Sequence, residues 1–332
     1  MRFTRFLARG LAALLVTAFT VGAQAQDAWP SKPITLVVGY APGGVTDVTA
    51  RIIAEFTGQE LGQPIVVKNL PGVNGILGIT SVKSAAPDGY TLLFGGSTHQ
   101  VFLPLMDPKL PYDPVKDFTI VSPVANFDWI VVTAPNSGYA NFAQLVDAMK
   151  KPDARFTFPH AGVATPYYLN TKVLVNMVGG KAEAIQYKGS GPALVDVMAG
   201  RLSFGLDTLS SVRDLIATGK LVALATTSPT PHEGPAASIP TYEKLGYPRL
   251  AQVNWSTWNS ILVPAAVSPD IVGKLNQAMA RALANPKLVE RFSSMGLRPM
   301  TGYSAEKSSA FVREQIRQWG PLLKAADIKL DN

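Results

Sequence analysis

Short apolar runs and helical repeats alternate along most of this chain. Ile34 to Val38 is an apolar run, and Val48, Ile52 and Phe56 then recur every four residues, as on one face of a helix. Further β-branched or aromatic runs lie at residues 65–67, 91–94, 156–158, 185–187, 202–206 and 221–225. Most of them lead through a turn into a helical pattern. This order predicts βαβ units, in which mainly parallel sheets carry helices on both faces. The glycine-rich turns are then expected at the carboxyl ends of the strands, where open α/β sheets bind ligands.

Two apolar stretches predict that the chain crosses between two lobes. Residues 129–134 leave the first half of the chain, and residues 255–263 return to it. The first lobe is therefore expected to be discontinuous, with residues 26–129 and 254–332, and the second lobe to comprise residues 130–253. A mature chain of about 305 residues is long enough to bury the cores of two domains.

The last part of the chain is predicted to be mainly helical. Helical patterns cover residues 269–283, 287–295 and 304–319. The loop of residues 226–239 contains three prolines and is expected to be a flexible connection.

The N-terminus has the pattern of a cleaved signal peptide, residues 1–25. Its positive region contains three arginines, Arg2, Arg5 and Arg9. An apolar core at 11–19 and the small-x-small site at 23–25 follow, so the mature chain is expected to start near Gln26. The core is shorter than the roughly 20 residues that span a bilayer. We therefore expect a soluble periplasmic protein, with an uncleaved anchor as the alternative.

Charge and cysteine content exclude several classes of function. Loss of the signal peptide removes three arginines and no acidic residue, so the formal charge falls from +7 to +4. The basic residues never form a run, so no nucleic-acid partner is expected. The chain has no cysteine, which excludes disulfides and thiolate chemistry.

The turn of residues 40–51 carries the strongest local signal for a ligand. Gly43 and Gly44 follow the first apolar run and precede a helix, and either can adopt angles closed to other residues. Thr46 or Asp47 can cap that helix, whose free N–H groups then form an anion site. Packing of the turn is the alternative explanation for its glycines.

Polar side chains in the other turns extend the candidate site. Thr46, Asn74, Ser97 and Thr98 can offer hydroxyl or amide groups to an oxygen-rich ligand. For Asp47 and Asp207, helix capping competes with contact to a ligand. Neither of the first two glycine turns contains lysine or arginine, so an anion there must be met by N–H groups and helix dipoles.

The three histidines do not indicate an enzyme. His99 and His160 follow strands and are open candidates for ligand contact, while His232 lies in the proline-rich loop. No carboxylate or second histidine stands at metal-ligand spacing, and no nucleophile-elbow, dinucleotide-binding or phosphate-loop motif is present. We expect no catalytic residue, no cofactor and no metal.

Aromatic residues cluster near the predicted crossings and turns. They are Tyr40, Phe127, Trp129, Tyr167, Tyr168, Trp255 and Trp258. Core and hinge packing is the expected role, because tryptophan is usually buried. The alternative is that one ring stacks on a flat ligand in the cleft.

A series of short motifs runs through the mature chain in a fixed order. In the first half these are Trp29-Pro30-x-Lys32-Pro33-Ile34, Pro42-Gly43-Gly44-x-x-Asp47-x-x-Ala50-Arg51, Asn69-x-Pro71-Gly72, Pro87-Asp88-Gly89-Tyr90-Thr91-Leu92-Leu93 and Tyr112-Asp113-Pro114-x-x-Asp117-Phe118. The second half adds Tyr187-Lys188-Gly189-x-Gly191-Pro192-Ala193 and Gly219-Lys220-Leu221-x-Ala223-Leu224-Ala225. In these motifs the chain resembles the Bug-type periplasmic solute receptors of tripartite tricarboxylate transporters.

The resemblance implies a two-lobed periplasmic-binding-protein fold of type II, a venus flytrap. It further implies that a small carboxylate is held by backbone amides of the first two glycine loops and enclosed by the second lobe. Carried over by position and joined to the polar candidates above, the expected ligand contacts are Pro42, Gly43, Gly44, Thr46, Asp47, Gly72, Asn74, Gly75, Ser97, Thr98, His99, His160, Ala161, Gly162, Thr165 and Asp207.

The chain departs from the family pattern around this expected pocket. Leu70 stands where arginine is usual, Asn74 replaces a glycine, and the loop at 160–166 is bulkier and less polar. The ligand therefore need not be the family's commonest one. The expected class is a di- or tricarboxylate, with an aromatic dicarboxylate left open. The implied partners are the membrane subunits of a tripartite tricarboxylate transporter, and the protein is expected to be a monomer. Presentation of the ligand to a membrane sensor kinase, and a periplasmic enzyme acting on a carboxylate, remain the alternatives.

Overall fold

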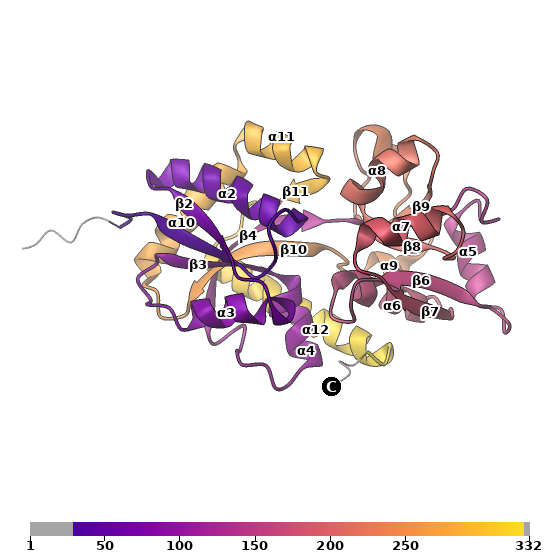
Figure 1. Cartoon of the computed structure of the whole chain (residues 1–332), viewed down its shortest axis with the longest axis horizontal. Helices are drawn as coiled ribbons and strands as arrows, with labels where there is room; N and C mark the ends of the chain where they lie inside the picture. The colour runs from indigo at the N-terminus through magenta and orange to yellow at the C-terminus, as the bar shows by residue number, and fades with distance from the viewer. Residues whose placement is uncertain (1–28, 329–332) are drawn as a thin grey trace, which may run out of the picture.

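The computed structural model describes residues 29–328, and its strands form two groups at opposite ends of the molecule (Figure 1). One group is a six-stranded sheet; the other contains a three-stranded and a two-stranded sheet. Each group carries helices, and we call them the first and second lobes. The expected two-lobed α/β fold is thereby confirmed. The predicted signal peptide, residues 1–25, lies outside the described residues.

The elements of the two lobes follow each other in the predicted order. The first lobe has the strands β1 (Ile34–Val38), β2 (Ile65–Asn69), β3 (Thr91–Gly96), β4 (Phe118–Phe127), β10 (Thr257–Pro264) and β11 (Leu297–Pro299). Its helices are α2 (Val45–Leu61), α3 (Ile76–Lys83), α4 (Leu103–Met106), α10 (Pro269–Leu283), α11 (Pro286–Ser294) and α12 (Ala305–Ala325), with the short turns η1 (Val73–Gly75) and η2 (Thr98–Phe102).

The elements between the two crossings alternate in the same way. The strands are β5 (Trp129–Thr133), β6 (Phe156–His160), β7 (Ala182–Gln186), β8 (Gly205–Thr208) and β9 (Val222–Thr226). The helices are α5 (Phe142–Met149), α6 (Pro166–Met177), α7 (Ser190–Met198), α8 (Leu209–Ala217) and α9 (Pro248–Ala251), with the short turn η3 (Gly234–Ser238).

The six-stranded sheet of the first lobe is mixed, whereas the second lobe has an antiparallel three-stranded sheet and a parallel two-stranded sheet. The strand order of the first lobe is β11-β4-β10-β3-β1-β2, and that of the second is β8-β5-β9 beside β6-β7. β1 pairs in parallel with β2 and β3, and β6 with β7. β5 and β10 run antiparallel to their neighbours. Both strands begin at a crossing, where their neighbours end, and this reverses their direction.

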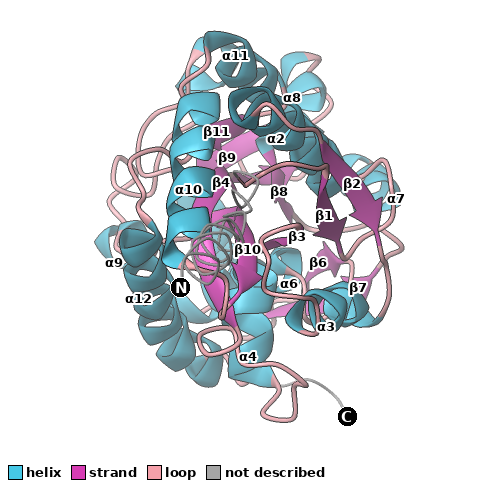
Figure 2. Cartoon of the chain, turned by 90° about the vertical axis from the view of Figure 1, so that its left-hand side faces the viewer, coloured by secondary structure: helices cyan, strands magenta, loops and turns pink. Residues whose placement is uncertain are grey.

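The core of the first lobe lies on both faces of its sheet. Because side chains alternate along a strand, Leu36 and Val37 of β1 face opposite sides. Leu36 packs with Ile53 of α2 and Leu275 of α10, whereas Val37 belongs to the core that includes Ile79 of α3. Figure 2 shows α2 and α10 on one side of the sheet and α3 on the other. Burial of each such side chain contributes about 1.5–3 kcal/mol.

No strand was predicted at β4, and Pro123 lies in its middle. Proline cannot donate a hydrogen bond to a neighbouring strand, yet β4 lies between β10 and β11. The pairing of β4 with β10 shifts register between Asn259 and Ser260, opposite Ala125 and Pro123. Such a bulge interrupts the ladder locally, so the missing N–H group is tolerated there.

Helix α12 extends further than the predicted end at residue 319 and reaches the second lobe. It continues through Pro321 to Ala325, although proline usually ends or kinks a helix. Trp319 is 1% and Leu323 is 3% exposed, so burial on either side of Pro321 favours the continued helix. At its end, the Ala325 carbonyl accepts a hydrogen bond from Asn176 of α6 at 3.1 Å. α12 thus packs against both lobes (Figure 1).

The chain crosses between the lobes at two neighbouring places. Asp128 alone separates β4 from β5, and residues 254–256 precede β10. The Trp129 indole N–H donates to Thr257 Oγ1 at 3.0 Å, so a side chain at one crossing holds the other. The lobe boundaries 26–129 with 254–332 and 130–253 stay a prediction. Between residues 29 and 328, no helix combines the length and apolar character needed to cross a membrane.

Candidate functional site

A cavity of about 400 Å³ and a smaller one of about 250 Å³ lie beside the crossings, and the smaller contains most of the polar candidates from the sequence. We call the smaller one the cleft cavity, because its walls come from both lobes. It is lined by Tyr40, Thr46, Gly95, Gly96, Ser97, Thr98, His99, Phe127, Trp129, Thr165, Pro166, Thr208, Thr257, Trp258 and Asn259. Many of these residues lie at or just after the carboxyl ends of strands in each lobe, which is where α/β sheets place ligands, and others lie at the starts of β5 and β10. Its volume suits a small molecule.

The first glycine loop precedes α2 and differs in detail from the expected capping. Gly44, not Thr46 or Asp47, is the N-cap of α2. Because glycine has no side chain, no side-chain hydrogen bond caps this helix. Gly43 has φ +88°, which favours glycine, whereas Gly44 is extended with φ −76°. The conformational requirement expected for both glycines therefore applies to Gly43 alone. The first N–H groups of α2 have no partner within the helix and form one edge of the cleft.

Asp47 braces this loop from within the protein. Its carboxylate accepts hydrogen bonds from the Gly43 N–H at 2.9 Å, from Arg51 at 3.0 Å and from Asn69 Nδ2 at 2.9 Å. Burial opposes the charge on Asp47, but these bonds outweigh it and hold the pKa of the carboxyl below its usual value. Asn69 also donates to the Tyr40 carbonyl, so the network joins the first loop to the end of β2. The structural role of Asp47 is evident, and ligand contact by it stays a prediction.

The second glycine loop depends on left-handed backbone angles. Gly72, Asn74 and Gly75 have φ values of 141°, 54° and 88°. Asparagine is among the residues that adopt this region most readily, so Asn74 is a workable replacement for glycine. A Cβ on Gly39 would lie 2.8 Å from the Gly75 Cα, so glycine allows the end of β1 to approach this loop closely.

His99 joins three of the loops. Its Nε2 lies 3.0 Å from the Asn74 carbonyl and 3.1 Å from the Tyr40 hydroxyl. A carbonyl only accepts, so Nε2 carries the hydrogen in this contact. Burial lowers the pKa of His99 to about 4, so the ring is neutral near pH 7. Its Nδ1 is buried and has no partner among the described residues, so this nitrogen is left as an unpaired acceptor beside the cleft cavity.

The third loop brings hydroxyl groups to the cavity. Ser97 follows β3, and Thr98 begins the π-helical turn η2, a type of irregularity that is frequent at functional sites. The Ser97 hydroxyl is buried without a hydrogen-bond partner among residues 29–328. A buried unpaired hydroxyl costs about 1–3 kcal/mol, which a ligand or water oxygen would offset.

The second lobe contributes the N-terminus of α6 to the cavity. Thr165 is the N-cap of α6, and its hydroxyl donates to the Gly162 carbonyl at 2.6 Å. Gly162, at φ +130°, in turn donates its N–H to His160 Nδ1 at 3.1 Å. Burial lowers the pKa of His160. Thr165 and Pro166 line the cavity, while His160, Ala161 and Gly162 shape the loop behind them.

The end of β8 presents Thr208 to the cavity, next to the predicted Asp207. Neighbouring residues of a strand point to opposite faces, which is why Thr208 lines the cavity and Asp207 does not. Asp207 is 3% exposed and accepts hydrogen bonds from Ser190 Oγ and the Thr208 N–H. Burial raises the pKa of Asp207, and these bonds oppose the increase. The structure thus gives Asp207 a role in holding the start of α7.

Four of the aromatic residues near the crossings line the cleft cavity: Tyr40, Phe127, Trp129 and Trp258. Phe127, Trp129 and Trp258 are also at most 7% exposed, so they pack in the core as expected while lining the cavity, and stacking of a ring on a ligand stays a prediction. Burial raises the pKa of Tyr40 to about 12, so its hydroxyl stays protonated. The rings make one wall of the cavity apolar.

The polar walls carry no formal positive charge. No lysine or arginine is among the residues that line the cleft cavity. An anion is therefore favoured there by N–H groups, hydroxyls and the N-termini of α2 and α6, as expected from the first two loops. Within residues 29–328, no group of three histidine, cysteine, aspartate or glutamate side chains could hold a metal ion.

The predicted contacts divide into two sets. Thr46, Ser97, Thr98, His99 and Thr165 line the cavity. The other predicted contacts shape or flank it without lining it: Pro42, Gly43, Gly44, Asp47, Gly72, Asn74, Gly75, His160, Ala161, Gly162 and Asp207. Contact between any of these and a ligand stays a prediction.

Several residues that line the cleft cavity were not predicted from the sequence. Thr257 and Asn259, like the aromatic candidate Trp258 between them, come from β10, which returns from the second lobe and inserts beside β3. A Cβ on Gly96 would lie 2.3 Å from the Trp258 carbonyl, so the glycine after β3 allows this close pairing. The two segments are far apart in sequence, and no local pattern showed that they meet.

Comparison with known proteins agrees with this geometry. Residues 49–328 match the family model of the tripartite tricarboxylate transporter family receptor. Protein BugT of Bordetella pertussis is 30% identical over 331 residues, covering 99% of this chain and 100% of that protein. The structure of R. palustris Rpa4515 with adipate has a TM-score of 0.78 and 27% identity, covering 91% of this chain and 99% of that one. The structure of MatC from Rhodopseudomonas palustris with bound malate has a TM-score of 0.74 and 27% identity, with 89% and 100% covered.

Proposed function

This chain belongs to the tripartite tricarboxylate transporter receptor family, and we propose that it binds a small carboxylate in its cleft cavity. The family is one of periplasmic solute receptors, which are not enzymes. The proposal extends to delivery of that ligand to the membrane subunits of a tripartite tricarboxylate transporter. It also includes the periplasmic location and the cleaved signal peptide of residues 1–25.

The observation that carries the proposal is the donor set of the cleft cavity. Ser97, Thr98, Thr165 and Thr208 bring hydroxyl groups from both lobes to a cavity that no lysine or arginine lines. Hydroxyl and N–H donors suit a carboxylate, whose two oxygens accept several hydrogen bonds. A ligand bound by uncharged donors is also released without breaking an ion pair, as handover to a transporter requires.

The relatives support the class of ligand. Rpa4515 was solved with adipate and MatC with malate, both dicarboxylates. The cavity of about 250 Å³ is comparable in scale with a molecule of this size. Its apolar wall, formed by rings such as Phe127 and Trp129, favours a carboxylate with an aliphatic chain or a flat ring over one that is polar throughout.

A thermal-shift screen of mono-, di- and tricarboxylates, including aromatic dicarboxylates, tests the proposal. A ligand at about 100 times its dissociation constant adds roughly 2.7 kcal/mol, which is several degrees in Tm. Thr98→Val should weaken the best ligand, and Ser309→Ala, on helix α12, is the matched control. A complete absence of shifts across the screen would count against carboxylate binding.

Turnover and gene neighbourhood separate the alternatives. Conversion of a bound carboxylate to product would support a periplasmic enzyme, and a neighbouring sensor-kinase gene would support signalling. Genes for a large and a small membrane subunit beside this one would support transport. Sedimentation of the purified protein tests the expected monomer.

Intact mass of the periplasmic protein tests the proposed location. We expect a mass that starts near Gln26, because the short apolar segment and the small-x-small site precede it. A purified protein that retains residues 1–25 would contradict cleavage and leave the anchored alternative.

A further inference from the structure

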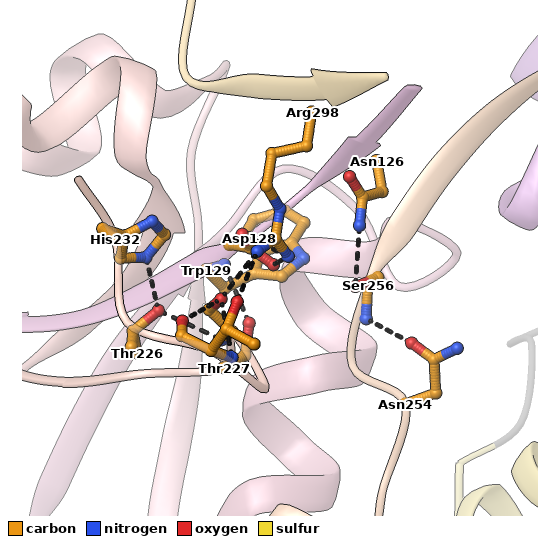
Figure 3. Close-up of polar contacts among 11 residues, drawn as sticks. Asn126, Asp128, Trp129, Thr226, Thr227, His232, Asn254, Ser256 and Arg298 are labelled. Carbon is orange, nitrogen blue, oxygen red and sulfur yellow. Dashed lines mark hydrogen bonds and ion pairs between the residues drawn. The ribbon is translucent and has the colours of Figure 1, made fainter. Parts of the chain in front are cut away.

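The larger cavity, of about 400 Å³, lies behind the crossings and is separate from the cleft cavity. We call it the rear cavity. Its walls also come from both lobes: Tyr242 and Ser228 belong to the segment before the second crossing, and Met300 and Tyr303 follow β11. Figure 3 shows the polar residues Asn126, Ser256 and Asn254 at the crossing strands beside it.

Alternation along the crossing strands places the two cavities on opposite faces. Asn126 lines the rear cavity and Phe127 the cleft cavity. In the second crossing, Ser256 lines the rear cavity and Thr257 the cleft cavity. Because successive side chains of an extended chain point to opposite sides, the paired crossings form the wall between the cavities. The two crossing segments therefore line both cavities.

Two pairs of aromatic rings line the rear cavity. Tyr242 and Trp255 form one pair with ring centroids 6.0 Å apart, and Tyr303 and Phe311 form another at 5.6 Å. Such rings favour a flat apolar or cationic group. Among the described residues, Glu243 is the one charged residue of the lining, and no lysine, arginine or histidine contributes to it. The charge of this cavity is thus opposite to what an anion would need.

Two polar atoms of the lining residues have no partner within the described chain. They are the Tyr242 hydroxyl and Asn126 Oδ1, both buried. Tyr242 is only 2% exposed, and the buried hydroxyl is left with an unused donor. Buried polar groups are rarely unpaired in folded proteins, so these atoms point to an occupant that hydrogen-bonds with them.

We propose that the rear cavity is a second binding site, for a small aromatic molecule that is neutral or carries an ammonium group. The ring would lie between the aromatic pairs, a polar group would meet Tyr242 and Asn126, and an ammonium group would meet Glu243. This site is independent of the proposed carboxylate site in both place and charge preference.

Binding there should change the affinity of the cleft. Rotation of the lobes about the crossings changes both cavities at once, because each is lined by both lobes. A ligand in the rear cavity therefore binds the open and closed forms with different affinity and shifts their population. This consequence rests on the proposed closure of the cleft, whereas binding in the rear cavity does not.

Tyramine is the probe for this site, because it combines a phenol ring with an ammonium group. Titration calorimetry of the purified protein should give a dissociation constant of about 1 mM or lower. Tyr242→Phe and Glu243→Gln should each weaken tyramine about tenfold, the loss expected for one hydrogen bond or charge contact. Glu243 is exposed, so its replacement leaves the packed core unchanged. Thr98→Val, in the cleft cavity, should leave tyramine affinity unchanged.

The acid 4-hydroxyphenylacetate is the matched control for charge. It has the same ring as tyramine with a carboxylate in place of the ammonium group. In displacement of bound tyramine, its dissociation constant should be at least about tenfold higher than that of tyramine itself. Equal displacement would overturn the charge preference. No tyramine binding, or binding that is weakened by Thr98→Val but not by Tyr242→Phe or Glu243→Gln, would overturn the site. A failed carboxylate screen would leave a tyramine result standing, so the two proposals fail separately.

Discussion

Arg298 and Asp128 form an ion pair where the chain first crosses between the lobes. Nη2 of Arg298 lies 2.9 Å from Oδ1 and 2.8 Å from Oδ2 of Asp128 (Figure 3). Nη1 of the same guanidinium donates to Ser228 Oγ at 3.0 Å and Thr230 Oγ1 at 3.2 Å. Arg298 belongs to β11, so one side chain of the first lobe holds both the crossing and the loop after β9. The first part of the loop predicted to be a flexible connection is thereby anchored.

Removal of this arginine should destabilise the protein. Asp128 is 3% exposed; burial raises the pKa of its carboxyl, and the Arg298 charge opposes that increase. Arg298→Met leaves the carboxylate buried without its partner, so we expect the free energy of unfolding at pH 7 to fall by about 3 kcal/mol. Urea unfolding measures it. The double variant Asp128→Asn/Arg298→Met should lose less, and an equal loss in both variants would contradict the ion-pair explanation.

Adding a side chain at Gly43 should disturb the first glycine loop, whereas adding one at Gly44 should not. Gly43→Ala forces φ +88° on a residue with a side chain, at a cost of about 1–2 kcal/mol, and should weaken the carboxylate ligand as the loop shifts. Gly44→Ala should leave both the fold and the loop unchanged, because Gly44 is extended and no atom lies within 4 Å of the added Cβ. Thermal unfolding and ligand titration of the two variants make a matched comparison. Equal effects would refute the φ argument.

His99 should make stability depend on pH below neutrality. Its pKa is lowered to about 4 by burial, so between pH 6.5 and 4 the unfolded chain binds a proton that the folded chain does not. Stability is then full above pH 6.5 and falls as the pH drops, by up to about 3 kcal/mol for this residue. His99→Gln can still donate to the Asn74 carbonyl but does not titrate.

Urea unfolding at several pH values between 4 and 7 tests this dependence. In the His99→Gln variant, the slope of the unfolding free energy against pH should correspond to about one proton fewer than in the unmodified protein. His232, whose pKa is also lowered to about 4 by burial and by Arg298, remains in the variant and keeps a second proton in the slope. A slope identical to that of the unmodified protein would show that His99 is not the titrating group.

Ligand binding should close the lobes about the two crossings. The cleft cavity is lined from both lobes, so a ligand contacts more surface when they approach each other. Small-angle scattering should show a smaller radius of gyration with saturating ligand. Intrinsic fluorescence should change as well, because Trp129 bonds to Thr257 of the other crossing, and Trp129→Phe should reduce that change. An unchanged scattering profile would favour a rigid cleft.

The amino-acid sequence alone was sufficient for most of the strands and helices that rest on neighbouring residues. The apolar run at Ile34 to Val38 and the helical repeat after it correctly predicted β1 and α2, because periodicity reflects which side of an element is buried. Thr46, Ser97, Thr98 and His99 were found as candidates because polar residues after a strand lie at its carboxyl end. The ordered series of short motifs was enough to identify the family.

Only the tertiary structure decided features that join distant segments. β4 was not predicted; Pro123 is unfavourable in an inner strand, and the bulge that tolerates it exists only in the pairing with β10. Local spacing cannot show that Thr257 and Thr208 face one cavity, or that Asp207 turns away to Ser190. Residue periodicity records which face of an element is buried, but not which other element covers it. The rear cavity, formed where β11, the second crossing and the segment around Tyr242 meet, is therefore visible only in the folded chain.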